Sequence, residues 1–307
     1  MHLIDPPCRL AIAAVIALVT LVGCSGAEPA AAPPTTTGSA DPTAAPSSVA
    51  TVAPPAGLSA SLVQYRRDQP RRFVEVKLDN STDATLDVTL LAVALPGFTP
   101  STDVLRTTNM KADRRVDLPV ALGEVICDRP PDGTARATVE VASDDGSTRR
   151  TVLPVDDDGL LDRLRGFECA LQRANAAVAI ELAPTWQRQG SGSALTVRGE
   201  ATITAQSSDV TADITAVDGG ILFVVKPDAV TPPPPITVDD GQPQATIAFD
   251  MIPARCDGHA IAEAKRLTTV TFLVAVDGDE PVPLRRAPAE AGYQTLVTAL
   301  RERCDTG

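Results

Sequence analysis

The chain has 307 residues, of which 39 are acidic and 27 are basic, so its formal net charge at pH 7 is −12. This charge argues against generic binding to nucleic acids or to anionic membrane surfaces, and it favours solubility. The basic residues are overwhelmingly Arg, which together with the many Ala residues indicates the codon bias of a high-GC genome. The abundance of Arg is therefore weak evidence for function by itself.

An apolar segment without charged residues, 10–22, follows an N-terminal region in which Arg9 is the only Arg or Lys. At ~13 residues it is too short to span a bilayer comfortably, which takes about 20 residues. It has the length of the apolar region of a signal peptide. The segment ends in Leu21-Val22-Gly23-Cys24, and there the chain resembles the lipobox of bacterial lipoprotein precursors.

The lipobox resemblance implies that residues 1–23 are removed as a signal peptide and that Cys24 becomes the acylated N-terminal residue, carrying fatty acids such as palmitate. Membrane lipid attached through Cys24 would hold the protein on the extracytoplasmic face of the cell membrane, because two or more acyl chains anchor a protein stably. The alternative is ordinary secretion with an incidental cysteine.

Residues 24–57 are expected to form a disordered stalk. From Ser25 to about Pro55 they are almost entirely Ala, Pro, Thr, Ser and Gly, and only Glu28 and Asp41 are charged. Such a segment buries too little apolar surface to offset its ordering entropy. Its prolines favour extended conformers of about 3 Å per residue, so the stalk could hold a folded part several tens of ångströms above the membrane.

The remaining ~250 residues suggest two domains, and two stretches, 58–175 and 176–307, look alike. Period-2 alternation between polar turns predicts half-buried antiparallel strands in both. In the first stretch the expected strands include 60–65, 73–78, 86–90 and 137–141. In the second they include 178–182, 201–205, 211–215 and 270–274.

The second halves of the two stretches match better than the first halves. Each has a Cys-Asp pair, then a strand, then an Asp-Gly turn, and each closes with an amphipathic segment, 160–169 or 296–304. The apolar spacing of these segments predicts short helices. The sequence therefore predicts an internal duplication, although chance similarity of β-rich patterns remains an alternative for the first halves.

Four cysteines remain after Cys8 and Cys24 are set aside, and four cysteines allow three pairings. The duplication selects one bridge per repeat, Cys127 with Cys169 and Cys256 with Cys304. Closing a loop of ~45 residues is worth about 3–4 kcal/mol in the chain-entropy model. A zinc site is the alternative, but the sequence lacks the closely spaced cysteine pairs that such sites use.

The predicted fold class is mainly β. Short strand patterns separated by Gly- and Pro-rich turns predict two tandem immunoglobulin-like β-sandwich repeats. Each repeat is expected to be closed by a short C-terminal helix that a disulfide links to it.

No motif for catalysis stands out in the sequence. His259 is the only histidine after the signal peptide, and no Gly-x-Ser-x-Gly, His-Glu-x-x-His or phosphate-loop motif accompanies it. Asp156-Asp157-Asp158-Gly159 lacks the spacing of a calcium loop. We therefore expect no catalytic residues, no metal site and no cofactor.

Paired arginines recur at five places in the chain: Arg66-Arg67, Arg71-Arg72, Arg114-Arg115, Arg149-Arg150 and Arg285-Arg286. The last two pairs follow the Asp-Gly turn of each repeat. The planar guanidinium groups of two such pairs at equivalent places could bind carboxylate or phosphate groups. The candidate anion-binding residues are therefore Arg149, Arg150, Arg285 and Arg286. The alternative is a surface hairpin that balances nearby carboxylates.

These features favour a membrane-anchored, extracytoplasmic lipoprotein that serves as a non-catalytic interaction or assembly module of the cell envelope. Its expected partners are membrane lipid through Cys24 and an envelope protein or polymer, and not nucleic acid. A lipoprotein that binds a small molecule, a lipid or an ion is the second hypothesis. A hydrolase that uses His259 ranks third.

Overall fold

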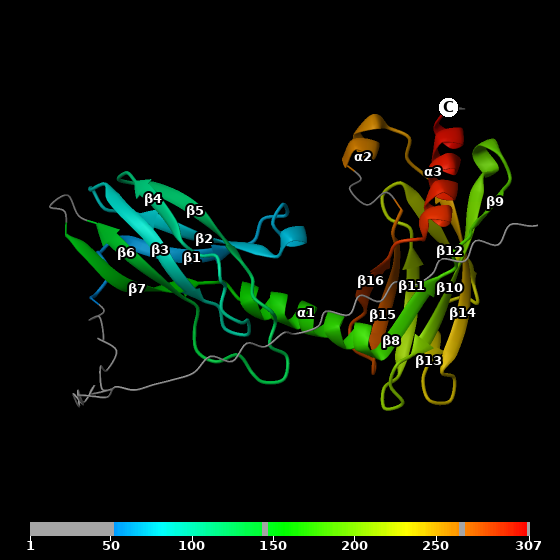
Figure 1. The fold of residues 1–307 in the computed structure, drawn as a ribbon, viewed down its shortest axis with the longest axis horizontal. Coiled ribbons are helices and arrows are strands. Elements are labelled where there is room, and N and C mark those ends of the chain that lie inside the picture. Colours follow the sequence, from blue (N-terminus) through cyan, green and yellow to red (C-terminus); the bar gives the residue numbers. More distant parts are fainter. Residues whose placement is uncertain (1–51, 143–146, 264–267, 306–307) are drawn as a thin grey trace, which may run out of the picture. The chain divides into compact units, whose positions relative to one another are not determined.

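The computed structural model describes residues 52–142, 147–263 and 268–305. They form two β-rich lobes and three α-helices (Figure 1). The expected signal peptide, the lipidation site at Cys24 and most of the expected stalk lie outside the described residues. None of the described helices is both long and apolar enough to cross a membrane.

Seven strands build the first lobe: β1 (Leu58–Val63), β2 (Phe73–Asn80), β3 (Leu86–Ala94), β4 (Arg106–Met110), β5 (Arg114–Ala121), β6 (Arg136–Ala142) and β7 (Thr148–Asp156). A short 3₁₀ turn, η1 (Gln69–Arg71), lies between β1 and β2. The helix α1 (Leu160–Ala177) follows β7.

Nine strands build the second lobe: β8 (Val178–Leu182), β9 (Gln187–Gln189), β10 (Thr196–Ala205), β11 (Ala212–Asp218), β12 (Phe223–Thr231), β13 (Ile236–Val238), β14 (Gln244–Pro253), β15 (Val270–Val276) and β16 (Val282–Arg286). The other elements are η2 (Gly192–Ala194), α2 (Gly258–Glu263) and α3 (Glu290–Asp305).

The strands of the first lobe follow the order β4-β3-β6-β7-β1-β2-β5. The described strand pairs are antiparallel except β1 with β7, which is parallel and short. The strands at the two ends of this order, β4 and β5, are consecutive in the chain and are joined by a tight turn in which Asp113 has a φ of 55°. The sheet therefore curves into a nearly closed barrel (Figure 1).

Strict alternation in β2 shows how the sequence produces this core. Val74, Val76 and Leu78 have no exposed surface, whereas Lys77 and Asp79 on the opposite face are partly exposed. Successive side chains of a strand point to opposite faces, so each aliphatic residue of such a pattern enters the core.

The second lobe has two sheets, with strand orders β12-β14-β10-β8 and β13-β11-β15-β16, and β9 pairs with β10 at the side. Its core contains a chain of edge-to-face aromatic contacts, in which Trp186 lies 5.6 Å from Phe249 and Phe249 lies 6.2 Å from Phe272. Such pairs add to the stability that burial provides. Aromatic residues are only 3% of the chain, so Val, Leu, Ile and Ala fill most of both cores.

The helix α1 contributes to both hydrophobic clusters. Leu161 in its first turn packs in the core of the first lobe, and Ala174 and Ala177 near its end pack in the core of the second. The sequence predicted a helix over 160–169 and a domain boundary at 175/176. The observed helix extends to Ala177 and crosses that boundary.

Both expected disulfides are present, Cys127–Cys169 and Cys256–Cys304. In each case the second cysteine lies in the helix that follows the last strand of the lobe, α1 or α3. The chain is therefore mainly β, with two disulfides, one of which involves the C-terminal helix.

The last residues of the predicted stalk have defined contacts. Val52 forms a parallel bridge with Thr151 of β7, and the Thr151 hydroxyl donates a 2.7 Å hydrogen bond to the Val52 carbonyl. The folded part therefore begins before residue 58, which is the predicted start of the first domain.

The two disulfides generate a test of stability. The Cys127→Ala/Cys169→Ala variant is expected to lose about 3–4 kcal/mol of unfolding free energy, because the bond closes a loop of 42 residues in the unfolded chain. Cys256→Ala/Cys304→Ala, with a separation of 48 residues, is expected to lose a similar amount. Urea denaturation of the oxidised chains measures both losses. Reduction should no longer affect a chain that carries all four substitutions, and unchanged stability of either double variant contradicts the expectation.

Candidate functional site

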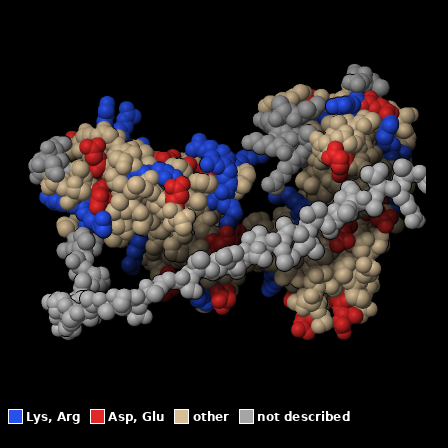
Figure 2. Space-filling model, viewed as in Figure 1, with Lys and Arg blue, Asp and Glu red and all other residues tan. Residues whose placement is uncertain are grey.

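Four of the seven residues 66–72, in the loop between β1 and β2, are arginines: Arg66, Arg67, Arg71 and Arg72. Basic side chains gather at this place on the face drawn in Figure 2, where Figure 1 shows a short blue helical turn. Arg66, Arg67 and Arg71 are exposed, and Arg72 is partly buried. This arginine loop is the densest group of positive charge in the sequence and stands out in a chain of net charge −12.

Asp68 folds the arginine loop into a defined turn, although it is an acid with only 3% of its surface exposed. Its carbonyl accepts hydrogen bonds from the backbone amides of Arg71 and Phe73, both at 3.1 Å. Its own amide donates to the Tyr65 carbonyl at 2.9 Å, and its carboxylate accepts from the Tyr65 amide at 3.3 Å. Pro70 stands in the first turn of η1, where a missing amide hydrogen has no cost.

Aromatic rings support two of the exposed guanidinium groups. The Arg67 guanidinium lies 5.0 Å from the centre of the Tyr65 ring, and the Arg71 guanidinium lies 4.5 Å from the centre of the Phe73 ring. Both distances are within the range of cation–π attraction. Stacking restricts the side chains while the N–H groups at the edge of each guanidinium remain able to donate.

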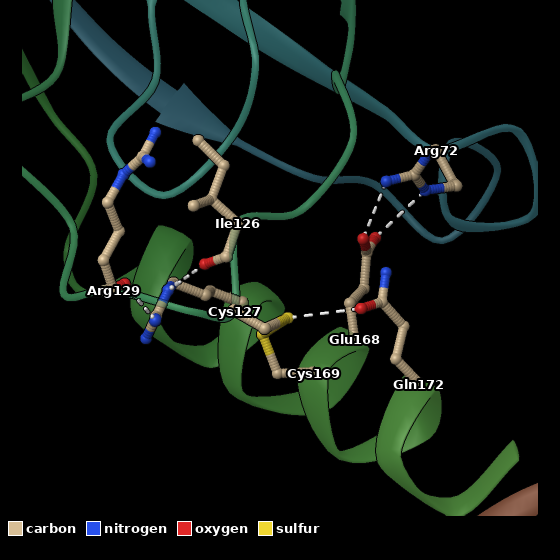
Figure 3. Close-up of a disulfide and its surroundings, with 8 residues drawn as sticks. Arg72, Ile126, Cys127, Arg129, Glu168, Cys169 and Gln172 are labelled. Carbon is tan, nitrogen blue, oxygen red and sulfur yellow. Dashed lines mark hydrogen bonds and ion pairs between the residues drawn. A yellow bond between two sulfur atoms is a disulfide. The ribbon is translucent and has the colours of Figure 1, made fainter. Parts of the chain in front are cut away.

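Arg72 connects this loop to α1 (Figure 3). It has a φ of 53°, in the left-handed region, and its guanidinium donates to both carboxylate oxygens of Glu168, at 3.1 and 2.7 Å. It also donates to the Gly123 carbonyl at 2.9 Å and lies 3.5 Å from Glu124. The bond to Glu168 raises the pKa of Arg72 above its usual range. Arg72 is therefore a structural arginine rather than a free one.

The same face of α1 carries the disulfide (Figure 3). Arg165 donates to the carbonyls of Ile126 and Arg129, at 3.0 and 2.8 Å, on either side of Cys127. Cys169 lies one residue after Glu168, so the disulfide and the Arg72–Glu168 pair attach neighbouring positions of α1.

Two carboxylates of the β1-β2-β5 sheet, those of Glu75 and Asp117, lie next to the arginine loop and to Asp68 within it. Asp117 accepts a 2.6 Å hydrogen bond from the Tyr65 hydroxyl. Arg67 lies 3.6 Å from Glu75 and 3.7 Å from Asp68. Glu75 is only 4% exposed, and its Oε2 has no hydrogen-bond partner among the described residues; neither has the Oδ1 of Asp117.

Burial raises the pKa of Glu75, and the negative charge of Asp68 raises it further, while Arg67 acts in the opposite direction. The pKa of Tyr65 is also raised, chiefly because its hydroxyl donates to Asp117. No group of three or more His, Cys, Asp or Glu side chains within the described ranges has a geometry that could hold a metal ion. The cluster lies against the arginine loop and contacts Arg67 and Tyr65.

The arginine pairs that the sequence singled out do not occupy equivalent places. Arg149 and Arg150 are the second and third residues of β7, and they pair with Val141 and Glu140 of β6. Arg285 and Arg286 are the last two residues of β16, far from the Asp277-Gly278 turn. The two pairs therefore lie at opposite ends of their strands, one near the start of β7 and the other at the end of β16.

The members of each pair also differ in their surroundings, since consecutive strand residues face opposite sides. Arg150 forms a 2.8 Å ion pair with Glu140, and Arg286 donates to the Ile180 carbonyl and to Asn175, each at 3.2 Å. Burial lowers the pKa of Arg286. Arg149 and Arg285 are exposed. The structure does not bring the four side chains together as one anion site, and anion binding by the exposed members stays a prediction.

An open groove of about 460 Å³ lies on the outer face of β3 and β6. Its lining is mostly apolar and includes Ala92, Ala94, Pro96 and Val152, with Arg136 at its edge. His259, in the short helix α2, is exposed.

Sequence reasoning noticed the arginine pairs of this loop but missed the residues that organise them. The Asp68-Gln69-Pro70 turn was an available signal, because Asp and Pro favour tight turns. The burial of Glu75 had no sequence signal, since alternation places it on the outward face of β2, and only the folded loop covers it.

No protein-family model matches this chain, and no curated protein matches it. Among solved structures, the YadV chaperone aligns over 71% of this chain and 92% of its own, with 14% identity and a TM-score of 0.20. A Porphyromonas gingivalis W83 protein of unknown function aligns over 74% and 94%, with 14% identity and a TM-score of 0.21. Red sea bream transglutaminase aligns over 76% of this chain but 31% of its own, with 9% identity and a TM-score of 0.21. Likenesses this weak support no argument about function.

Glu75→Gln is expected to raise the thermal midpoint of the first lobe by an amount that grows from about pH 4 to about pH 8. The raised folded-state pKa of Glu75 means that its contribution to stability is present below its ordinary pKa and is lost as the pH rises through the folded-state value. Gln does not ionise and keeps its contribution. Calorimetry at several pH values measures the difference between the two chains.

Asp103→Asn is the matched control, because Arg106 lowers the pKa of Asp103. Its contribution to native stability is present above the ordinary pKa, so this variant should lose stability at high pH rather than gain it. A difference between Glu75→Gln and the native chain that shrinks with rising pH would falsify the assignment.

A double-mutant cycle with Arg72→Ala and Glu168→Ala is expected to give a coupling energy of about 1 kcal/mol. The side chains are 39% and 17% exposed and form two hydrogen bonds, so solvent screens them only partly. The control cycle uses Arg106 and Asp103, whose carboxylate side chain is 76% exposed, and should give a smaller coupling. Equal couplings would contradict a special role for the Arg72–Glu168 pair.

Proposed function

We propose that this chain is a lipoprotein anchored to the extracytoplasmic face of the cell membrane, and that its β-lobes form a non-catalytic interaction module of the envelope. The Leu21-Val22-Gly23-Cys24 motif supports the anchor. The observation that carries the proposal is the pair of disulfides, Cys127–Cys169 and Cys256–Cys304, because such bonds persist in oxidising compartments.

In this proposal each lobe is an immunoglobulin-like unit, and the two arose by duplication. Two features support it. Strand order in the first lobe separates β1-β2-β5 from β4-β3-β6-β7, which is compatible with a two-layer sandwich whose layers meet at the short β1–β7 pairing. In both lobes a disulfide joins the segment between two strands to the helix after the last strand.

The arginine loop supports an interaction role. It is exposed, folded by its own backbone hydrogen bonds, and positively charged in an acidic chain. Loops carried on rigid β-scaffolds are a common place for binding residues. The second hypothesis is a lipoprotein that binds a small molecule, a lipid or an ion, and the mostly apolar groove on β3 and β6 favours the first two of these ligands.

Metabolic labelling with a palmitate analogue in a bacterium that processes lipoproteins tests the anchor. The native chain is expected to carry label and to sediment with membranes, whereas Cys24→Ser should carry none, because its hydroxyl replaces the thiol that receives the lipid. Cys8→Ser is the control and should be labelled like the native chain, since residue 8 leaves with the signal peptide. An unlabelled native chain found in the cytosol with reduced thiols would refute the proposal.

A further inference from the structure

We propose that the arginine loop binds phosphodiester groups of a linear anionic polymer, with Arg66 and Arg71 as the principal ligand-binding residues and Arg67 as a third donor. The location of that polymer in the envelope rests on the proposed function, but the binding chemistry rests on the loop alone.

Arg66 and Arg71 differ from the other two arginines of the loop in having no acidic partner among the residues that the structure describes. Arg72 is occupied by Glu168, and Arg67 lies against Asp68 and Glu75. The Arg71 guanidinium lies against the Phe73 ring.

The register of β1 and β2 brings the supporting rings together. β1 and β2 pair as far as Val63 with Glu75. Tyr65, just beyond the end of β1, and Phe73, the first residue of β2, both lie at this end of the pairing. The Gln64 side chain, which donates to the Phe73 carbonyl at 3.0 Å, holds this end of the hairpin closed. Arg67 and Arg71, which stack on these rings, therefore lie on the same outer face, and a ligand can meet both without ordering a flexible segment first.

The chemistry of the loop suits phosphate groups. All its positive charges are guanidinium groups, whose planar fork donates two parallel hydrogen bonds to phosphate oxygens. The rest of the chain is acidic, and an extended anionic surface such as a membrane would also meet those acids. A thin polyanion reaches the loop alone, because charges farther away than about 8 Å are screened at physiological salt.

Titration of the acylated, oxidised mature chain in neutral detergent with a synthetic poly(glycerol phosphate) oligomer tests the proposal. Arg66→Gln/Arg71→Gln is expected to weaken binding by about tenfold or more, because two charge-assisted hydrogen-bonding groups are lost. Arg66→Lys/Arg71→Lys keeps the charge but loses the planar guanidinium groups that donate two parallel hydrogen bonds, and it should weaken binding by about threefold.

The matched control is Arg114→Gln/Arg301→Gln, which removes the same charge from two exposed arginines outside the loop and outside the candidate anion-binding pairs. It should change the affinity by less than about twofold. Equal weakening by the control, full affinity of Arg66→Gln/Arg71→Gln, or no binding of the oligomer overturns the proposal. Thermal midpoints and non-reducing peptide maps verify that each variant is folded with both disulfides.

Two further probes separate the classes of anion. Polyglutamate of similar charge should bind more weakly than the phosphate oligomer, and vesicles containing phosphatidylglycerol should not bind in a way that depends on Arg66 and Arg71. Loop-dependent vesicle binding of equal strength would identify a lipid surface instead and overturn the polymer assignment. The palmitate experiment reports on the anchor independently, so an unlabelled chain that still binds the oligomer refutes the anchor and leaves the loop chemistry standing.

Discussion

The attachment of α1 and α3 to their β-lobes by disulfides is the constraint on which the rest of the structure depends. α1 has 18 residues but only Leu161, Ala174 and Ala177 are buried, so burial of apolar surface alone holds it weakly. The Cys127–Cys169 bond and the Arg72–Glu168 pair hold the middle of the helix, where residues 162–173 are exposed or only partly buried. Fold stability and the proposed location outside the cytosol therefore depend on the same chemistry, since the bond needs an oxidising compartment.

Sequence patterns predicted the strands and cysteine pairs because both follow from short-range rules. Val178–Leu182 was predicted to the residue, and Phe73–Asn80 was predicted to within two residues, since alternation is strict in both. The cysteine pairing followed from the similar order of motifs in the two halves. Helix length was underestimated, because the Ala-rich segment 170–177 lacks the amphipathic spacing that marked residues 160–169, although Ala has the highest helix propensity.

The arginine loop could not be derived in the same way. Its geometry depends on the burial of Asp68 and on a register that brings Tyr65 and Phe73 to the same end of a hairpin. Sequence spacing shows that arginines are paired, but not which of them meet an acid on another element. Glu168 is 96 residues from Arg72 in the chain, and the ion pair between them decides that Arg72 is structural while Arg66 is free to bind.

The position of Glu75 links the charge state of the loop to its proposed ligand. An anion held by Arg66 and Arg71 adds negative charge above a carboxyl that is already buried and close to Asp68, so it favours the protonated form of Glu75. By reciprocity, protonation of Glu75 strengthens anion binding by the same factor. When Glu75 is ionised it competes with the ligand for Arg67, 3.6 Å away. When ionised, Glu75 therefore offsets part of the positive charge of the arginine loop. This buried acid distinguishes the loop from a simple patch of exposed bases.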